Sequence, residues 1–360
     1  MCETPDVATR RRRQSGQTGE EPRAVSLKEL ARHLNLSPAT VSLVLNNVPA
    51  ARAIPKGTKE RIFAAARRLN YRPNFVARSL RAKRTYAAGV IVPELSDGYS
   101  ALVLSGVEDL LLKEGYMYLV ASHRHRPELI QQYPALLIER CVEGLIAVDT
   151  PCERPLPVPV VCVSGHRRVP GVTNIVLNHK RAGDLALGHL VELGHRRIAF
   201  VKGQAFSSDT EVRWEALRSA AARFGIEVRP PLVVQLQGES PSPEVGYLAA
   251  KKLLAGGERF TALVAFNDIS AIGAIRAFRE AGLRVPEDVS VVGFDDAYAA
   301  AFHIPALTTI RQPLYQMGKL AAETLLRLIA SGAEHQPAYL KVEPELVVRE
   351  SSGPAPVELG

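Results

Sequence analysis

Residues 26–46 encode two short helices joined by a tight turn, and this pair constrains the fold more than any other segment. Ser26 and Glu29 have the spacing of a capping box, in which the serine hydroxyl accepts a backbone amide and the glutamate carboxylate reaches back to the cap. Ser37 is a second N-cap, and Pro38 follows at the first helical position, where its missing amide costs nothing. The pattern therefore predicts one helix that begins directly after Ser26 and another that begins directly after Ser37.

A third helix is expected to follow Thr58, which serves as its cap. Each of the three helices carries apolar residues at helical spacing on one face. These predicted core residues are Leu27, Leu30, Ala31, Leu34, Val41, Val44, Leu45, Ile62, Ala65, Ala66 and Leu69. Three such helices can close a small core, although the same pattern also fits a plain helical bundle.

Positive charge is concentrated at the start of the chain. The first 84 residues contain 18 Lys and Arg against 6 Asp and Glu, whereas the remainder contains 27 against 31. Non-specific affinity for nucleic acid comes from cations that release the counterions condensed on phosphates, so this local surplus is typical of a DNA-binding segment. The charge therefore favours a DNA-binding head over a plain bundle.

Two stretches of this basic region, SPATVSLVLN and LNYRPNFVARSLRAKRT, resemble the DNA-binding head and the hinge of the LacI/GalR family of transcriptional regulators. Four later stretches are similar to the effector domain of that family: GHRRIAFVKG, TALVAFNDISAIGAI, VPEDVSVVGFDD and PALTTIRQP. The likeness covers roughly residues 25–350. It implies a ligand-responsive, sequence-specific DNA-binding regulator, expected to be a repressor, that binds a palindromic operator as a homodimer.

The resemblance also implies the order of domains. An all-α three-helix head with a hinge helix precedes a two-lobed α/β domain of the periplasmic-binding-protein type, with parallel sheets. The expected boundaries are 1–24 for a disordered arm, 25–73 for the head, 74–84 for the hinge, 85–350 for the effector-binding and dimerisation domain, and 351–360 for the tail. Lobe 1 is expected at 85–177 and 314–340, and lobe 2 at 178–313 and 341–350.

In this family the hinge helices of two subunits pack together in the minor groove. The matching leucine, Leu80, would wedge into the central base step, and Ala77 is small enough to let the paired helices approach. Asn74, Arg78 and Arg81 are placed to contact phosphates. An alternative is that Leu80 folds back on the head.

The second helix departs from the best-known family members at the positions that contact bases. Pro38, Ala39 and Leu43 stand there, and none has a side-chain donor or acceptor, so sequence preference would depend on apolar contacts, hydroxyls and DNA shape. Thr40, Ser42, Asn46 and Thr58 match family positions that contact the DNA backbone, which fix the register but carry no sequence information, and Ser37 is a further expected DNA contact.

Beyond residue 84 the pattern changes to short apolar runs that alternate with helical stretches, which argues for parallel α/β sheets. The expected strands are 87–92, 117–121, 144–148, 158–163, 197–201, 232–235, 261–266 and 289–293. The length suits two lobes, and the resemblance places the crossings between them near Leu177, Leu314 and Lys341.

Open parallel sheets bind ligands beyond the carboxyl ends of their strands, so polar residues there are candidates for an effector site. Asp149, Asn267, Asp268 and Asp295 follow expected strands, and Asp268 fits equally well as a helix cap. The family resemblance adds Arg213, whose planar fork would grip a carboxylate or hydroxyls. Ser96, Tyr99, His123 and Arg124 would close the other side of the cleft. Histidines and arginines at 123–126 hint at an acid-bearing effector, while sugars and nucleobases remain open.

Motifs for catalysis are lacking, since no dinucleotide fingerprint, Walker loop, HExxH or GxSxG occurs. We therefore expect no enzyme activity and no cofactor. We also expect no metal site, because His123 and His125 have no third ligand at a useful spacing. The segment 1–24 has no apolar core of a signal peptide, no stretch is long enough to span a membrane, and the four cysteines form no CxxC pair. These features predict a cytoplasmic protein. The alternative function is a solute-binding or sugar-processing α/β protein with a basic N-terminal extension.

Overall fold

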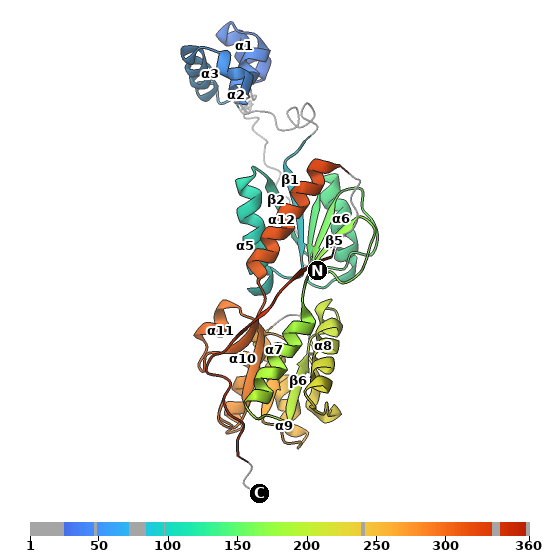
Figure 1. Ribbon diagram of the computed structural model, residues 1–360. Helices are drawn as coiled ribbons and strands as arrows, with labels where there is room; N and C mark the ends of the chain where they lie inside the picture. Colours follow the sequence, from blue (N-terminus) through green and yellow to red (C-terminus); the bar gives the residue numbers. More distant parts are fainter. Residues whose placement is uncertain are drawn as a thin grey trace, which may run out of the picture. The chain divides into compact units, whose positions relative to one another are not determined.

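The computed structural model describes residues 25–46, 49–71, 84–96, 98–238, 242–332 and 339–357, which belong to two units that divide after Arg84 (Figure 1). Each unit is considered by itself. The expected arm and hinge contacts at Asn74, Ala77, Arg78, Leu80 and Arg81 lie outside the described residues.

The N-terminal unit contains the three predicted helices and one additional turn of 3-10 helix. The elements are α1 (Leu27–Leu34), α2 (Pro38–Leu45), η1 (Pro49–Ala53) and α3 (Lys56–Arg68). The Ser26 hydroxyl accepts from the amide of Glu29, whose carboxylate accepts the Ser26 amide at 2.7 Å. The hydroxyl of Ser37 caps α2 in the same way, at 3.1 Å from the Thr40 amide. Local sequence signals thus determine where the first two helices begin.

The start of α3 differs from the prediction. Pro55 occupies the N-cap and the helix begins at Lys56, so Thr58 lies in the first turn and does not cap it. The 3-10 turn η1 ends at Ala53, and the chain enters α3 at Lys56, two residues before Thr58. The core of the unit is formed by the fully buried Leu30, Val41 and Ile62, as predicted.

The described part of the second unit contains two six-stranded sheets, which confirms the predicted α/β fold with mainly parallel sheets. The eight expected strands are present, but the strands at 172–177, 308–311, 339–342 and 345–347 were not predicted. The first sheet, here called lobe 1, has the order β11-β5-β4-β3-β1-β2 and is entirely parallel. Its strands are β1 (Ala87–Val92), β2 (Met117–Ser122), β3 (Leu145–Val148), β4 (Val160–Val163), β5 (Val172–Leu177) and β11 (Tyr339–Val342). Its helices are α5 (Gly98–Lys113), α6 (Pro127–Glu139) and α12 (Leu314–Ser331).

The second sheet, here called lobe 2, has the order β12-β10-β9-β8-β6-β7. Its strands are β6 (Ile198–Lys202), β7 (Val233–Gln235), β8 (Ala262–Val264), β9 (Ser290–Asp295), β10 (Thr308–Arg311) and β12 (Glu345–Val347). Its helices are α7 (His179–Glu192), α8 (Asp209–Arg223), α9 (Pro243–Ala255), α10 (Asp268–Glu280) and α11 (Tyr298–Phe302), with the 3-10 turn η2 (Pro230–Leu232). Only the edge strand β12 among these described strands runs antiparallel to its neighbour, β10.

The chain crosses between the lobes after β5, between β10 and α12, and between β11 and β12. Helix α12 returns to lobe 1 and lies beside α5 (Figure 1). Glycines make this approach close, because a Cβ at Gly106 or Gly318 would stand 1.9 Å from a carbonyl oxygen of the facing helix. A glycine also allows α9 and α10 to pack closely, because a Cβ at Gly273 would stand 1.8 Å from the carbonyl oxygen of Pro243. Among the described helices, none has both the length and the apolar character needed to cross a bilayer.

Candidate functional site

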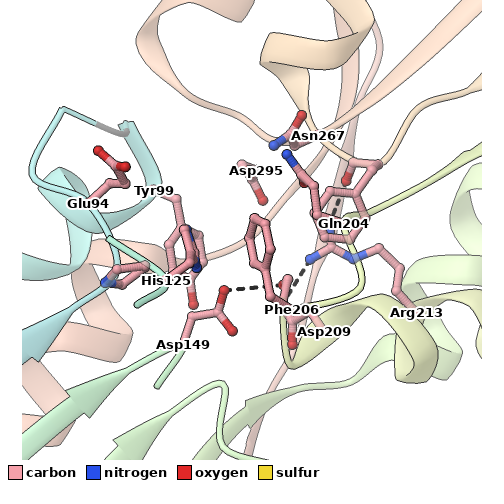
Figure 2. Close-up of a pocket in the computed structure, with 13 residues that line it drawn as sticks. Glu94, Tyr99, His125, Asp149, Gln204, Phe206, Asp209, Arg213, Asn267 and Asp295 are labelled. Carbon is pink, nitrogen blue, oxygen red and sulfur yellow. Dashed lines mark hydrogen bonds and ion pairs between the residues drawn. The ribbon is translucent and has the colours of Figure 1, made fainter. Parts of the chain in front are cut away.

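A small cavity of about 50 Å³ lies between the carboxyl ends of the strands of the two lobes (Figure 2). Five predicted effector contacts line it: Tyr99, Asp149, Arg213, Asn267 and Asp295. The other lining residues are Pro93, Glu94, His125, Gln204, Phe206, Ser207, Asp209 and Phe266. The rule that ligands bind beyond the ends of parallel strands therefore leads to this cleft.

The backbone is unusual where strands enter the cleft. Asp149, Ser164 and Asp295 have φ values of 38°, 59° and 108°, a region that residues with a Cβ rarely occupy. Such conformations cost of order 1–3 kcal/mol each, and they cluster at functional sites. They turn the chain sharply at the ends of β3, β4 and β9, which places two carboxylates at the cavity.

Arg213, on α8, is held between two aromatic rings. Its guanidinium carbon lies 3.7 Å from the ring centre of Phe294 and 4.4 Å from that of Phe266. The guanidinium donates to Asp209 Oδ2 at 3.0 Å and to the Phe266 carbonyl oxygen. Within the described chain its buried Nε has no acceptor. The arginine is therefore rigidly positioned and retains one unused donor.

Contacts across the cleft hold the lobes closed. The Asp149 carboxylate of lobe 1 accepts from Ser207 Oγ at 3.1 Å and from the amide and hydroxyl of Ser208, in lobe 2, at 3.0 and 2.5 Å. The ring of Phe206 stacks on His125 with centroids 3.7 Å apart, and Figure 2 shows it between the two walls. Because the remaining volume holds roughly one or two waters, a larger ligand must open the lobes or displace Phe206.

The carboxylates of the cleft differ in their tendency to ionise. Burial, with a contribution from nearby Asp209, raises the pKa of Asp149 to about 6. Burial would also raise the pKa of Asp209, but His179, His166 and Arg213 outweigh it and hold that pKa well below its usual value. Asp209 is therefore the permanent anion of the cleft, whereas Asp149 titrates close to neutral pH.

Four predicted effector residues do not line the cavity. Asp268 is buried beneath it, where its carboxylate accepts from the Thr309 hydroxyl at 2.6 Å and the Ala297 amide at 2.8 Å. His123 is also buried, and its Nε2 hydrogen-bonds with the Thr150 hydroxyl. The remaining two, Arg124 and Ser96, are exposed. The histidines and arginines at 123–126 thus contribute only His125 to the cavity, which removes the hint of an acid-bearing ligand.

Several lining residues were missed although a signal existed. Gln204 and Phe206 follow β6, so the rule applied to Asp149 also applies to them. Glu94 follows β1 in the same way. The candidates predicted at strand ends are Asp and Asn residues, so glutamine, glutamate and phenylalanine at equivalent positions are not among them. Asp209 was missed because it begins a helix.

On the head, several side chains of α2 that are expected to contact DNA form hydrogen bonds with one another. The hydroxyls of Ser37 and Thr40 are 2.8 Å apart, and Asn46 Nδ2 donates to Ser42 at both its carbonyl and its hydroxyl. The expected base-contacting residues Pro38 and Ala39 are exposed, Leu43 packs partly against the core, and Thr58 is half-buried in α3. The exposed surface at the start of α2 is therefore mainly apolar.

Comparisons with known proteins identify both units. Residues 26–74 match the model of bacterial regulatory proteins of the lacI family, and residues 187–352 match that of a periplasmic binding protein-like domain. The chain is 32% identical over 338 residues to the HTH-type transcriptional repressor PurR of Haemophilus influenzae. This alignment covers 91% of this chain and 98% of that protein. It is 34% identical over 340 residues to PurR of Yersinia pestis, with coverage of 92% and 98%.

Solved structures agree with these relatives. The lac repressor dimer bound to operator and the anti-inducer ONPF superimposes with a TM-score of 0.80 at 27% identity, over 92% of this chain and all of that one. The complex of the transcriptional regulator CelR with cellobiose gives a TM-score of 0.67 at 27% identity, over 91% and 99%.

The matches extend through the head and the α/β unit together, so the basic segment is not an unrelated extension of a solute-binding protein. Because these relatives are transcriptional repressors and not enzymes, the prediction that this chain is not an enzyme is confirmed. The chain belongs to the LacI family of bacterial regulatory proteins and is a DNA-binding transcriptional regulator with an effector-binding domain.

Proposed function

We propose that this protein is a cytoplasmic repressor that binds a palindromic operator as a homodimer and responds to a small molecule in the cleft between its lobes. The head at 25–73 would contact one half-site, the hinge at 74–84 the central base step, and the domain at 85–350 the effector and the second subunit. The observation that carries the effector site is the buried guanidinium of Arg213, whose Nε has no acceptor in the described chain. A buried donor without a partner costs about 1–3 kcal/mol, which a ligand oxygen or nitrogen would recover.

The charge of the cleft favours a neutral ligand that is rich in donors. Among the described residues, Glu94, Asp149, Asp209 and Asp295 line the cavity together with one arginine, Arg213. Ionised carboxylates accept hydrogen bonds and repel anions. The aromatic faces of Phe206 and Phe266 add apolar surface on which a ring can stack. A sugar or a nucleobase meets both requirements, and the CelR complex described above holds a sugar, cellobiose.

The effector site can be tested with a pair of arginines on one helix. A panel of sugars and nucleobases would first be screened for compounds that raise the melting temperature of the full chain. Arg213→Ala should then weaken binding of the active compound by roughly 10- to 100-fold, since a charge-assisted hydrogen bond contributes about 1.5–3 kcal/mol. Arg218→Ala, on the exposed side of α8, is the control and should bind normally.

Operator binding should survive the change at Arg213, because the head lies in a separate unit. Unchanged ligand affinity in Arg213→Ala would overturn the assignment of the site. Loss of operator binding together with a lowered melting temperature would show that Arg213→Ala misfolds. The ligand-binding test would then use Arg213→Lys in place of Arg213→Ala.

The homodimer is supported by apolar side chains around α11. Tyr298, Phe302 and Ile304 are 78%, 85% and 74% exposed. Exposed apolar residues that cluster in this way mark interaction surfaces, and the lac repressor neighbour is a dimer on its operator. Phe302→Asp should shift the chain from dimer to monomer in sedimentation equilibrium and weaken operator binding. A Phe302→Asp variant that sediments as the native dimer would place the interface elsewhere.

The operator can be found by selecting bound sequences from random duplex DNA at several salt concentrations. We expect an enriched palindrome, because each head of a dimer contacts one half-site. Binding that is equally strong to all sequences and steeply dependent on salt would show that α2 and the hinge cannot specify a site without effector.

A further inference from the structure

Two histidines and an aspartate meet where the chain passes from one lobe to the other. His166 follows β4 of lobe 1, whereas His179 and Asp209 begin α7 and α8 of lobe 2. One ligand atom from each of the three lies within 4.8 Å of the other two. His166 Nε2 is 2.6 Å from Asp209 Oδ1, and His179 Nε2 is 3.3 Å from the same oxygen. The cluster therefore joins the lobes through one carboxylate oxygen.

His179 is only partly satisfied by the protein. This residue is 5% exposed, and neither ring nitrogen makes a well-aligned hydrogen bond within the described part of the chain. Its Nε2 nevertheless points at the carboxylate oxygen of Asp209, 3.3 Å away. Buried imidazole nitrogens are almost always paired, since an unpaired polar group loses its hydration without compensation. A poorly hydrogen-bonded ring nitrogen that faces a carboxylate and lies near a second histidine is a candidate metal ligand.

The spacing of the three atoms suits a small transition-metal ion. With metal–ligand bonds of 2.0–2.1 Å, neighbouring ligands of a tetrahedral site are about 3.3 Å apart. The pair His179 and Asp209 already has this separation. The pair His166 and Asp209 would lengthen from its hydrogen-bonded 2.6 Å by roughly 0.7 Å, a small movement for a side chain that follows a strand.

A supporting contact fixes the carboxylate. Arg213 donates to Asp209 Oδ2 at 3.0 Å, which leaves Oδ1 directed at the two histidines. Hydrogen bonds of this kind orient the ligands of protein metal sites. Two imidazoles and one carboxylate are a ligand set that zinc commonly uses, with a fourth position left for water or another group.

We propose that His166, His179 and Asp209 bind one divalent transition-metal ion of the Zn²⁺ type, which links lobe 1 to lobe 2. Of the three proposed metal ligands, Asp209 also lines the effector cavity, whereas His166 and His179 do not. Because the ion takes ligands from both lobes, its binding would stabilise the closed arrangement of the lobes described above. Metal would thereby act on the same equilibrium as an effector.

The test measures Zn²⁺ binding by the metal-free full chain in competition with a chromophoric chelator, without DNA or effector. We expect one tight equivalent per chain, and a rise in melting temperature on its addition. His166→Gln and His179→Gln should each weaken this binding more than about 100-fold, since even loss of a supporting residue costs 10- to 100-fold. His123→Gln and His189→Gln are matched controls, because both remove a buried or half-buried histidine outside the cluster.

Co²⁺ provides a second readout that needs no variant. A tetrahedral site with nitrogen and oxygen ligands should give the intense visible absorption that octahedral Co²⁺ lacks, and Zn²⁺ should abolish it. Failure of the wild-type chain to bind Zn²⁺, or equal binding by the wild type, His166→Gln and His179→Gln, would overturn the proposal. Neither result bears on the effector site, which is measured separately through Arg213.

Discussion

Replacement of Asp268 by asparagine should remove a defined part of the pH dependence of stability. Asp268 is 1% exposed, and burial raises its pKa to about 7, despite hydrogen bonds from Thr309 and the Ala297 amide that lower it. The move from 3.8 to about 7 corresponds to roughly 4 kcal/mol in favour of the neutral form in the folded chain. A raised carboxyl pKa therefore contributes stability that is complete below pH 3.8 and is lost as the pH rises through 7.

The magnitude between two convenient pH values follows directly. Since the folded form titrates near 7 and the unfolded form near 3.8, the contribution of Asp268 to the free energy of unfolding should fall by about 2.5 kcal/mol between pH 5 and pH 8. The amide introduced by Asp268→Asn does not titrate, so the wild type should lose this amount relative to the variant. This amide is accommodated because its oxygen can accept from Ala297 while Thr309, which can rotate its hydroxyl, accepts from the new NH₂.

Urea denaturation at pH 5, 6.5 and 8 would measure the free energy of unfolding of the wild type and of Asp268→Asn. The fluorescence of the single tryptophan, Trp214, reports on lobe 2. The control is Asp288→Asn, because Arg284 lowers the pKa of this half-buried carboxyl to about 2 and its titration is complete below pH 5. Parallel pH profiles for the wild type and Asp268→Asn would refute the reasoning. They would show that Asp268 is ionised in the folded chain and leave it open as a ligand of the effector.

Three further predictions concern the head, the helix pair of lobe 1 and the hinge. Leu30→Ala, which empties a fully buried position of a small core, should destabilise the head by about 2–5 kcal/mol and abolish operator binding while the Trp214 transition is retained; normal operator affinity would contradict this. Gly318→Ala should lower the stability of lobe 1 by about 1–3 kcal/mol or more, whereas Gly57→Ala, with open space on α3, should stabilise the head by roughly 0.5–1 kcal/mol in thermal melts. Leu80→Ala should lose the preference for operator over random DNA while salt-sensitive non-specific binding persists, as measured by anisotropy titrations, and an unchanged preference would exclude a wedge.

Elements governed by neighbouring residues were predictable. Ser26 with Glu29, and Ser37 with Pro38, act within one turn of helix, so the structure begins α1 and α2 where the pattern requires. Four strands were not predicted: β5, β10, β11 and β12. Strand β5 was missed because its buried sequence VTNIVL includes Thr173 and Asn174, which interrupt the apolar run. Both polar side chains are nevertheless buried, since the sheet has neighbours on each side. The other three strands are short and include polar residues, as in TTIR, YLKV and ELV.

The choice between adjacent polar residues lay beyond the sequence. Asn267 and Asp268 follow the same strand, yet Asn267 lines the cavity and Asp268 lies beneath it, bonded to Thr309 of β10. Thr58 shows the same limit on the head, where the preceding turn starts α3 at Lys56. In each case the outcome depends on where another segment of the chain packs.

The sequence by itself determined the starts of the first two helices, most of the buried strands, the basic head, the family motifs and the strand ends at which polar residues gather, because these follow from interactions within a few residues. Tertiary structure decided which of those residues meet. His166, His179 and Asp209 have no spacing motif, and Phe206 and His125 come from different lobes, so their proximity arises only when the two sheets close on each other. Contacts between distant segments depend on how whole elements pack, and no local pattern of residues encodes that geometry.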